Sequence, residues 1–121
     1  DDDLISVISI DGEMELKDIN PRFMRFLEKL GPFGPGNMRP KFMSRNLQVS
    51  GQPRLMGKGE HIRFIVSQNG RNYPAVGFKL SSHYEDLIRG VPIDLAYVVE
   101  VNEWQGQSNI QLNVRDIHLS K

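Results

Sequence analysis

The sequence contains no cysteine and a single tryptophan among its 121 residues. The absence of cysteine excludes disulfides, thiol nucleophiles and thiolate metal ligands, and it is typical of proteins in the reducing cytoplasm, where we expect this one. No stretch approaches the roughly 20 consecutive apolar residues of a membrane-spanning helix, so we expect no membrane partner. The chain starts with three aspartates and has no initiating methionine. We therefore expect a piece of a longer protein, without a secretory signal.

Neither sign of charge is in excess, because 15 basic side chains balance 15 acidic ones. The balance is uneven along the chain. Residues 1–30 carry eight acidic and four basic side chains, a net charge of −4, whereas residues 31–121 carry seven acidic and eleven basic ones, a net charge of +4. The second part therefore favours an anionic partner such as nucleic acid, although many soluble domains share an excess of this size.

The first third of the chain predicts a strand, a helix and a loop. Residues 4–10 are apolar and β-branched, as in a short strand. Asn20 and Pro21 are suited to the cap and the first residue of a helix that ends at Gly31. Residues 31–37 contain three glycines and two prolines, a composition that predicts a loop.

From residue 42 onward the hydrophobic period changes to that of strands. The strands are expected at residues 42–49, 60–67, 72–78, 93–101 and 109–119, with a bend near Gly51, a tight hairpin at Asn69-Gly70 and a polar hairpin loop over residues 102–108. A short helix is expected over residues 82–88. The predicted class is mainly β: a five-stranded Greek-key barrel of the OB type with a short helix between strands three and four, preceded by a strand and a connecting helix.

The segment that leads into this barrel resembles a family signature. The run LEKLGPFGPGN at residues 27–37, followed by Pro40 and Phe42, is similar to the segment through which RecJ exonucleases enter their OB domain. Met38 stands where that family usually has proline. Further matches follow in the same order, at Gly57-Lys58, His61, Asn102, Gly106, Gln111-Leu112 and Asp116.

The resemblance covers nearly the whole chain and implies three parts. Residues 1–12 would be the tail of a preceding domain of the DHHA1 type, residues 13–37 a connecting helix and loop, and residues 38–121 the OB domain. The parent would be a hydrolase, a Mn²⁺- or Mg²⁺-dependent phosphodiesterase that degrades single-stranded DNA from the 5′ end in recombination and repair.

Two roles for the barrel remain open. It either binds single-stranded DNA and guides it to the catalytic domains of the same chain, or it acts as a structural module without DNA affinity. In the second role it would brace the catalytic domains or dock a partner such as single-strand-binding protein.

The chain itself offers no recognisable catalytic constellation. The Asp-His-His motif of the family's nuclease part is missing. His61, His83 and His118 lie 22 and 35 residues apart, which is not a spacing at which one helix or strand presents two ligands to one metal. We therefore expect no catalytic residue, metal site or cofactor in these residues.

The glycine- and proline-rich loop is expected to be structural. Its prolines lack the amide hydrogens that a phosphate cradle needs, and its glycines allow unusual backbone angles. The loop residues concerned are Gly31, Pro32, Phe33, Gly34, Gly36 and Asn37.

OB barrels bind nucleic acid on strands two and three and on the loops between strands one and two and strands four and five. The candidates at those places are Arg54, Lys58, Arg63 and Arg71 for phosphates, Tyr73 and Trp104 for stacking on bases, and His61 at the rim. Each has a structural alternative: the arginines as solvated charges, His61 as a hydrogen-bonded surface residue, and Trp104 as a plug at the barrel end. Phe64, Phe78 and Tyr97 are expected in the core.

Overall fold

The computed structural model describes residues 10–120, apart from the side chain of Trp104. The strand expected over residues 4–10 lies almost entirely outside the described residues. The elements are β1 (Gly12–Glu13), η1 (Leu16–Asp18), α2 (Pro21–Leu30), β2 (Phe42–Met56), β3 (His61–Gln68), β4 (Arg71–Gly77), η2 (Ser81–His83), α3 (Tyr84–Leu87), β5 (Ile93–Trp104) and β6 (Gln107–Leu119). None of the helices within residues 10–120 has the length and hydropathy needed to cross a bilayer.

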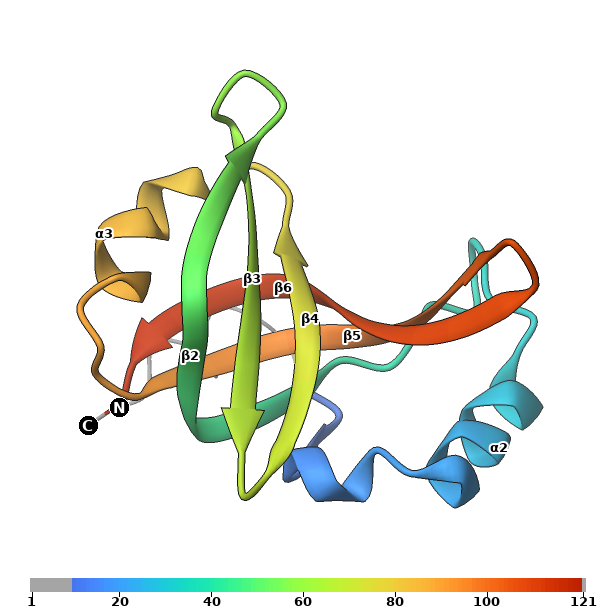
Figure 1. Ribbon diagram of the computed structural model, residues 1–121. Helices are drawn as coiled ribbons and strands as arrows, with labels where there is room; N and C mark the ends of the chain where they lie inside the picture. Colours follow the sequence, from blue (N-terminus) through green and yellow to red (C-terminus); the bar gives the residue numbers. More distant parts are fainter. Residues whose placement is uncertain (1–9, 121) are drawn as a thin grey trace.

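Five strands close into a barrel in the order β2-β3-β4-β6-β5, and β5 pairs back with β2 (Figure 1). All neighbours in this barrel are antiparallel except β4 and β6, which pair in parallel at Ala75–Leu112 and Val76–Asn113. The η2 and α3 turns lie between the third and fourth barrel strands. This architecture confirms the predicted OB-type Greek-key barrel.

Strand β2 pairs with both β5 and β3 because it bends twice. Its register against β5 shifts between Ser44 and Leu47, and its register against β3 shifts between Ser50 and Arg54. Gly51, with a φ of 75°, lies in the second irregularity, where the sequence predicted a bend. Bulges of this kind increase strand curvature, which a small closed barrel requires.

The β3–β4 and β5–β6 hairpins both use two-residue turns with positive φ. Asn69 and Gly70 have φ values of 50° and 83°, as the sequence predicted, and Gln105 and Gly106 have values of 50° and 78°. The polar loop expected over residues 102–108 is therefore wrong in length, because β5 and β6 stay paired up to Trp104 and Gln107. Residues 100–111 thus form a two-stranded projection, which we call the arm (Figure 1).

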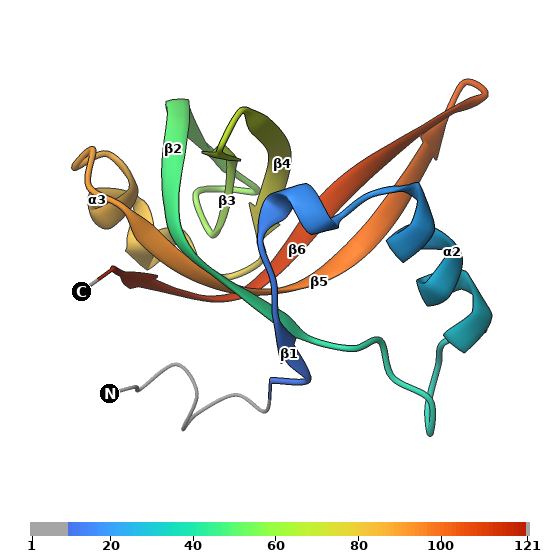
Figure 2. The same cartoon turned by 90° about the horizontal axis from the view of Figure 1, so that it is seen from below.

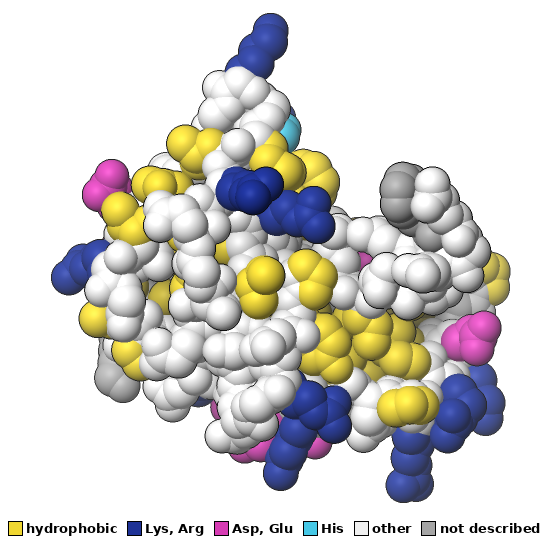
Figure 3. Space-filling view, viewed as in Figure 1, with side chains coloured by type: hydrophobic (Ala, Val, Ile, Leu, Met, Phe, Trp, Pro, Cys, Tyr) yellow, Lys and Arg dark blue, Asp and Glu magenta, His cyan; other side chains and the backbone are white. Residues whose placement is uncertain are grey.

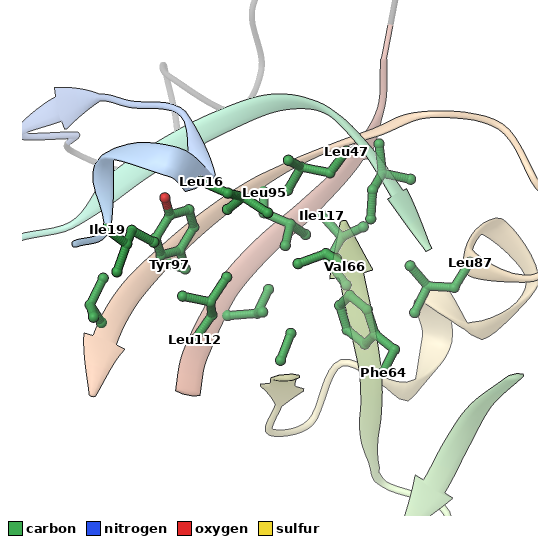
Figure 4. Packing of buried hydrophobic residues seen from close by; sticks show 14 of the residues in the cluster. Leu16, Ile19, Leu47, Phe64, Val66, Leu87, Leu95, Tyr97, Leu112 and Ile117 are labelled. Atoms are coloured by element: carbon green, nitrogen blue, oxygen red, sulfur yellow. The ribbon is translucent and has the colours of Figure 1, made fainter. Parts of the chain in front are cut away.

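The segment before α2 closes one end of the barrel. Residues 12–19, which we call the strap, include Leu16 and Ile19, whose exposed fractions are 0% and 1%. Both side chains point into the core toward Tyr97 (Figure 4), and the view from below shows η1 lying across the barrel end (Figure 2). The strap therefore packs as part of the barrel core.

Barrel strands attach the strap through hydrogen bonds to its backbone. Gln68 of β3 accepts from the Leu16 amide at 2.7 Å, and Tyr73 of β4 donates to the Ile19 carbonyl at 2.7 Å. Ser44 of β2 donates to the Met14 carbonyl, also at 2.7 Å. Such bonds satisfy backbone groups that would otherwise be costly to bury.

The predicted helix cap is confirmed, since the Asn20 side chain accepts from the Phe23 amide at 2.8 Å and α2 begins at Pro21. Leu27 of this helix is buried against the barrel, and the Phe23 ring meets the Phe42 ring edge-on at 5.4 Å. Phe26 points away from the barrel and is 54% exposed. The helix is thus fixed to the barrel by one face only.

Two of the three aromatic residues predicted in the core are there, and one is not. Phe64 and Tyr97 are buried, whereas Phe78 is 53% exposed. Strand β4 ends at Gly77, one residue before Phe78. Beyond the strand the alternation of inward and outward side chains no longer applies, and the Phe78 ring instead contacts the His61 ring at 5.2 Å.

Candidate nucleic-acid interface

On the β3–β4 face of the barrel, a groove of about 540 Å³ lies between these strands and the arm. This is the face on which OB barrels hold oligonucleotides. The β3–β4 wall of the groove is made by Arg63, Asn72, Tyr73 and Pro74, and the arm wall by Asn102, Ser108, Asn109, Ile110 and Gln111. Both polar and apolar side chains therefore line the groove, as nucleotides require.

The positive charge of this face is concentrated in one arginine pair. Arg54 of β2 and Arg63 of β3 are direct cross-strand partners, and both are exposed. Partners at this position project from the same face of the sheet. Figure 3 shows basic side chains above a row of hydrophobic ones on the face formed by β2 to β4. The pair can contact neighbouring phosphates of a strand that crosses the sheet.

The arm wall carries amide side chains that the sequence-based candidates did not include. Asn102 donates to the Gln111 side chain across the arm at 2.8 Å, which orients both amides. Asn109 lies directly opposite Asn102 in the ladder. The family resemblance drew attention to Asn102 and Gln111 as matching positions, but only the fold shows that they face Arg63 across a groove.

Tyr73 contributes to the groove wall but is not a free stacking surface. It is the cross-strand partner of the buried Val66, so its ring lies on the inward side of the sheet and packs against the core. Its hydroxyl is bonded to the Ile19 carbonyl of the strap. The ring is therefore held in place from two sides.

Lys58 and Arg71 do not join the arginine pair. Lys58 lies in the turn before β3, and Arg71 starts β4 beyond the other end of β3. At about 3.3 Å per residue, the eight residues of β3 separate Lys58 from Arg71 by more than about 20 Å. Arg71 is also the partner of Gln68, on the side of the sheet that faces the strap. The predicted residues thus form one central pair and two outlying charges.

His61 has a structural environment at the rim. Its Nδ1 accepts from the Lys79 amide at 2.8 Å, which places the hydrogen of the neutral ring on Nε2. The ring also lies against Gly57, where an added Cβ would approach His61 Cδ2 to 2.7 Å. Gly57 and His61, which both lie in the matching segment, are therefore in contact.

Trp104 ends β5 beside the Gln105–Gly106 turn, at the tip of the arm. Its side chain lies outside the described residues. The backbone of Trp104 therefore lies on the arm, which forms one wall of the groove. The sequence predicted that this residue contacts bases or packs against the barrel end.

The glycine- and proline-rich loop is held in shape by contacts between its own residues. The Asn37 side-chain amide donates to the carbonyls of Leu30 and Pro32 at 2.9 and 2.8 Å. Gly34 and Asn37 exchange two backbone hydrogen bonds of 2.9 Å. The Arg39 guanidinium lies over the Phe33 ring, 4.8 Å from its centre. These contacts lie within the loop and its two flanking residues, Leu30 and Arg39.

Tyr97 is linked to the strap through Ser44. Ser44 uses its hydroxyl hydrogen toward Met14, so the Tyr97 hydroxyl donates to Ser44 Oγ at 2.7 Å. Burial raises the pKa of Tyr97 to about 12. The phenol is therefore neutral at physiological pH and acts as a hydrogen-bond donor.

Within residues 10–120, no three histidine, aspartate or glutamate side chains come together in a way that would hold a metal ion. The residues present therefore do not fit the Mn²⁺ or Mg²⁺ that the family resemblance implies for the parent enzyme. No catalytic step is assigned to these residues.

Comparison with known proteins places this barrel in a family. The model of the RecJ OB domain matches residues 10–116. The single-stranded-DNA-specific exonuclease RecJ of Bacillus subtilis (strain 168) is 22% identical over 121 residues, which cover 100% of this chain and 15% of that protein.

Solved structures show the same fold. RecJ from Thermus thermophilus in complex with Mn²⁺ matches with a TM-score of 0.64 and 20% identity over 94% of this chain and 16% of that one. The same Thermus protein is also known in complex with Mg²⁺. The SSB domain of a Synechococcus protein matches with a TM-score of 0.51 and 17% identity over 67% of this chain and 94% of that domain.

This chain spans only 15% and 16% of the length of the Bacillus and Thermus RecJ proteins. Its relation to them is nevertheless specific, because the matched region includes the strap, α2, the loop and the barrel. The chain belongs to the RecJ OB domain family.

Proposed function

We propose that this chain is a DNA-binding OB module that holds single-stranded DNA in the groove between β3–β4 and the arm. The observation that carries the proposal is the adjacent pair Arg54 and Arg63 beside a groove lined with amide and apolar side chains. Guanidinium groups bind phosphates, and amides bind base edges. The Bacillus relative is named for single-stranded DNA, which is consistent with this ligand.

In a longer protein of this family, the module would guide the strand toward a nuclease carried by the remaining part of the chain. Mn²⁺ or Mg²⁺ would act there and not in the barrel. The strap supports this arrangement, because its backbone is bonded to β2, β3 and β4. Whatever precedes the strap would therefore be held in a defined position relative to the groove. Roles in recombination and repair would follow from the activity of the whole protein.

The proposal is tested by fluorescence anisotropy of a labelled single-stranded oligonucleotide, with a matched duplex for comparison. The variant Arg54→Ala/Arg63→Ala is compared with Arg22→Ala/Arg89→Ala, which removes the same charge from exposed positions outside the groove. At ~0.1 M salt each phosphate contact to a single strand contributes about 0.7 log unit to the binding constant. The groove variant should therefore bind about 25-fold more weakly. Its plot of the logarithm of the binding constant against the logarithm of the salt concentration should be shallower by about 1.4.

The control pair should keep most of the affinity, and the duplex should bind less well than the single strand. Equal losses in both variants would mean that net charge, and not the groove, attracts the DNA. Absence of single-strand binding at low salt would reject the proposal.

A second role has its own supporting observation. The net charge of the chain is zero, and Tyr73, the groove aromatic whose side chain is described, is held by the core and the strap. A barrel of this kind can serve as a brace for neighbouring domains or as a docking module for a protein partner, without DNA affinity of its own. The anisotropy experiment separates this role from the first.

A further inference from the structure

A second hollow lies between the arm and α2. Its volume is about 720 Å³, within the range of roughly 300–1,000 Å³ typical of small-ligand sites. Helix α2 forms one wall, the inward side of β5 the other, and the loop after α2 closes one end. Figure 3 shows hydrophobic side chains gathered in the space between the arm and α2.

The hollow and the groove adjoin at one cross-strand pair of the arm. Val101 of β5 lines the hollow and Ile110 of β6 lines the groove, and the two are direct partners in the ladder. Val101 is 46% exposed, which is high for a valine on the inward side of a strand. Direct partners project from the same face of a ladder, so this pair brings the hollow next to the groove.

The chemistry of the hollow differs from that of the groove. Its floor contains Met24, Leu27 and Val101, and the Phe33 ring with Arg39 over it stands at one end. Flat guanidinium and aromatic groups are surfaces on which bases stack. The flat face of a base can pack on this apolar floor, which removes both surfaces from water.

The charges at the rim cancel. Arg25 and Arg39 are opposed by Glu28 and Glu103, so the rim has no net attraction for a phosphate. It offers both hydrogen-bond donors and acceptors, which is what the edge of a nucleobase needs. Phosphates are instead favoured at Arg54 and Arg63, where no acidic side chain lines the groove.

We infer that the hollow between α2 and the arm binds one unstacked base of the single strand whose backbone lies in the groove. This subsite rests on the proposed function, because a strand must first occupy the groove. It assigns to α2 a direct part in DNA binding, beyond connecting the barrel to the preceding part of a longer chain.

The first test is NMR of the whole chain titrated with a single-stranded oligonucleotide and, separately, with an abasic strand of the same length. Signals of Val99, Val101 and Leu27 should shift with the normal strand and not with the abasic one. Signals around Arg63 should shift with both, because the abasic strand keeps its phosphates.

A pair of variants gives an independent readout. Val101→Gln makes one residue of the apolar floor polar without changing charge, and Val91→Gln makes the same change at a valine of similar exposure, 39% against 46%, outside both cavities. Val101→Gln should weaken single-strand binding about 5-fold or more, at the lower end of what contact with one base contributes. Val91→Gln should have no effect.

The two hypotheses fail in different ways. If signals around Arg63 shift while those of the hollow stay unchanged or respond equally to the abasic strand, the base subsite is rejected and the groove stands. Equal affinities of the Val101→Gln and Val91→Gln variants would also reject the subsite. If neither region responds to any strand, the proposed function fails as well.

Discussion

Replacing Leu16 with alanine tests whether the strap is part of the barrel core. The Leu16 side chain is fully buried, with an exposed fraction of 0%, and it belongs to the core cluster that also contains Ile19 and Tyr97. A Leu-to-Ala change at such a site costs the transfer of the lost methyl groups and leaves a cavity, about 2–5 kcal/mol together. We expect about 3 kcal/mol, which is a large part of the roughly 5–15 kcal/mol by which a domain of this kind is stable.

The measurement is urea unfolding followed by circular dichroism, with Leu30→Ala as the matched control. Leu30 is 40% exposed on α2, so its replacement should change the unfolding free energy by less than about 0.5 kcal/mol. If Leu16→Ala is as mild as this control, the strap does not contribute to the core.

A truncated chain extends the same reasoning to the predicted domain boundary. A chain of residues 38–121 lacks Leu16, Ile19 and Leu27, which are all buried in the core of the whole chain. It also leaves Tyr73 without the carbonyl that its hydroxyl binds. We expect this shorter chain to lose cooperative unfolding. A transition as sharp and as stable as that of the whole chain would refute the structural reasoning.

Two other predictions concern the pH dependence of stability and a turn. Because burial raises the pKa of Tyr97 to about 12, the folded chain keeps a proton that the unfolded chain loses above about pH 10. This contribution to the free energy of unfolding is complete below that pH and is lost as the pH rises to 12. By pH 11.5 the unfolding free energy of the wild type should have fallen by about 2 kcal/mol relative to that of Tyr97→Phe. Urea unfolding of both proteins at several pH values measures this, and parallel pH profiles would contradict it. At the β2–β3 turn, Gly57→Ala should lower the melting temperature more than Gly59→Ala. Both glycines have positive φ, 58° and 85°, but only an added Cβ at Gly57 meets a side chain, that of His61. Equal melting temperatures would mean that the His61 ring moves away at no cost.

Local signals in the sequence were sufficient for the elements whose geometry depends on a few neighbouring residues. Asn20 and Pro21 predicted the start of α2, and Asn69-Gly70 predicted a hairpin whose two residues both need positive φ. Hydrophobic alternation predicted the barrel strands, because one face of each strand is buried. The polar residues 102–108 were misleading, since an exposed two-stranded arm can be polar and still be fully paired.

The candidate site depended on distances between residues that are far apart in the chain. The sequence placed basic residues on the expected strands, but only the register brought Arg54 and Arg63 together and moved Arg71 to the far end. The inward position of Tyr73 and the amides opposite Arg63 likewise depend on how the strands pair.

The sequence alone determined the class of fold, the family and the order of the main elements, because these follow from periodicity, capping residues and a local motif. Tertiary structure decided that the strap completes the core, that Phe78 is exposed and that α2 and the arm enclose a second hollow. The physical reason is that burial and the grouping of side chains are set by packing between segments whose relative position no local sequence pattern specifies.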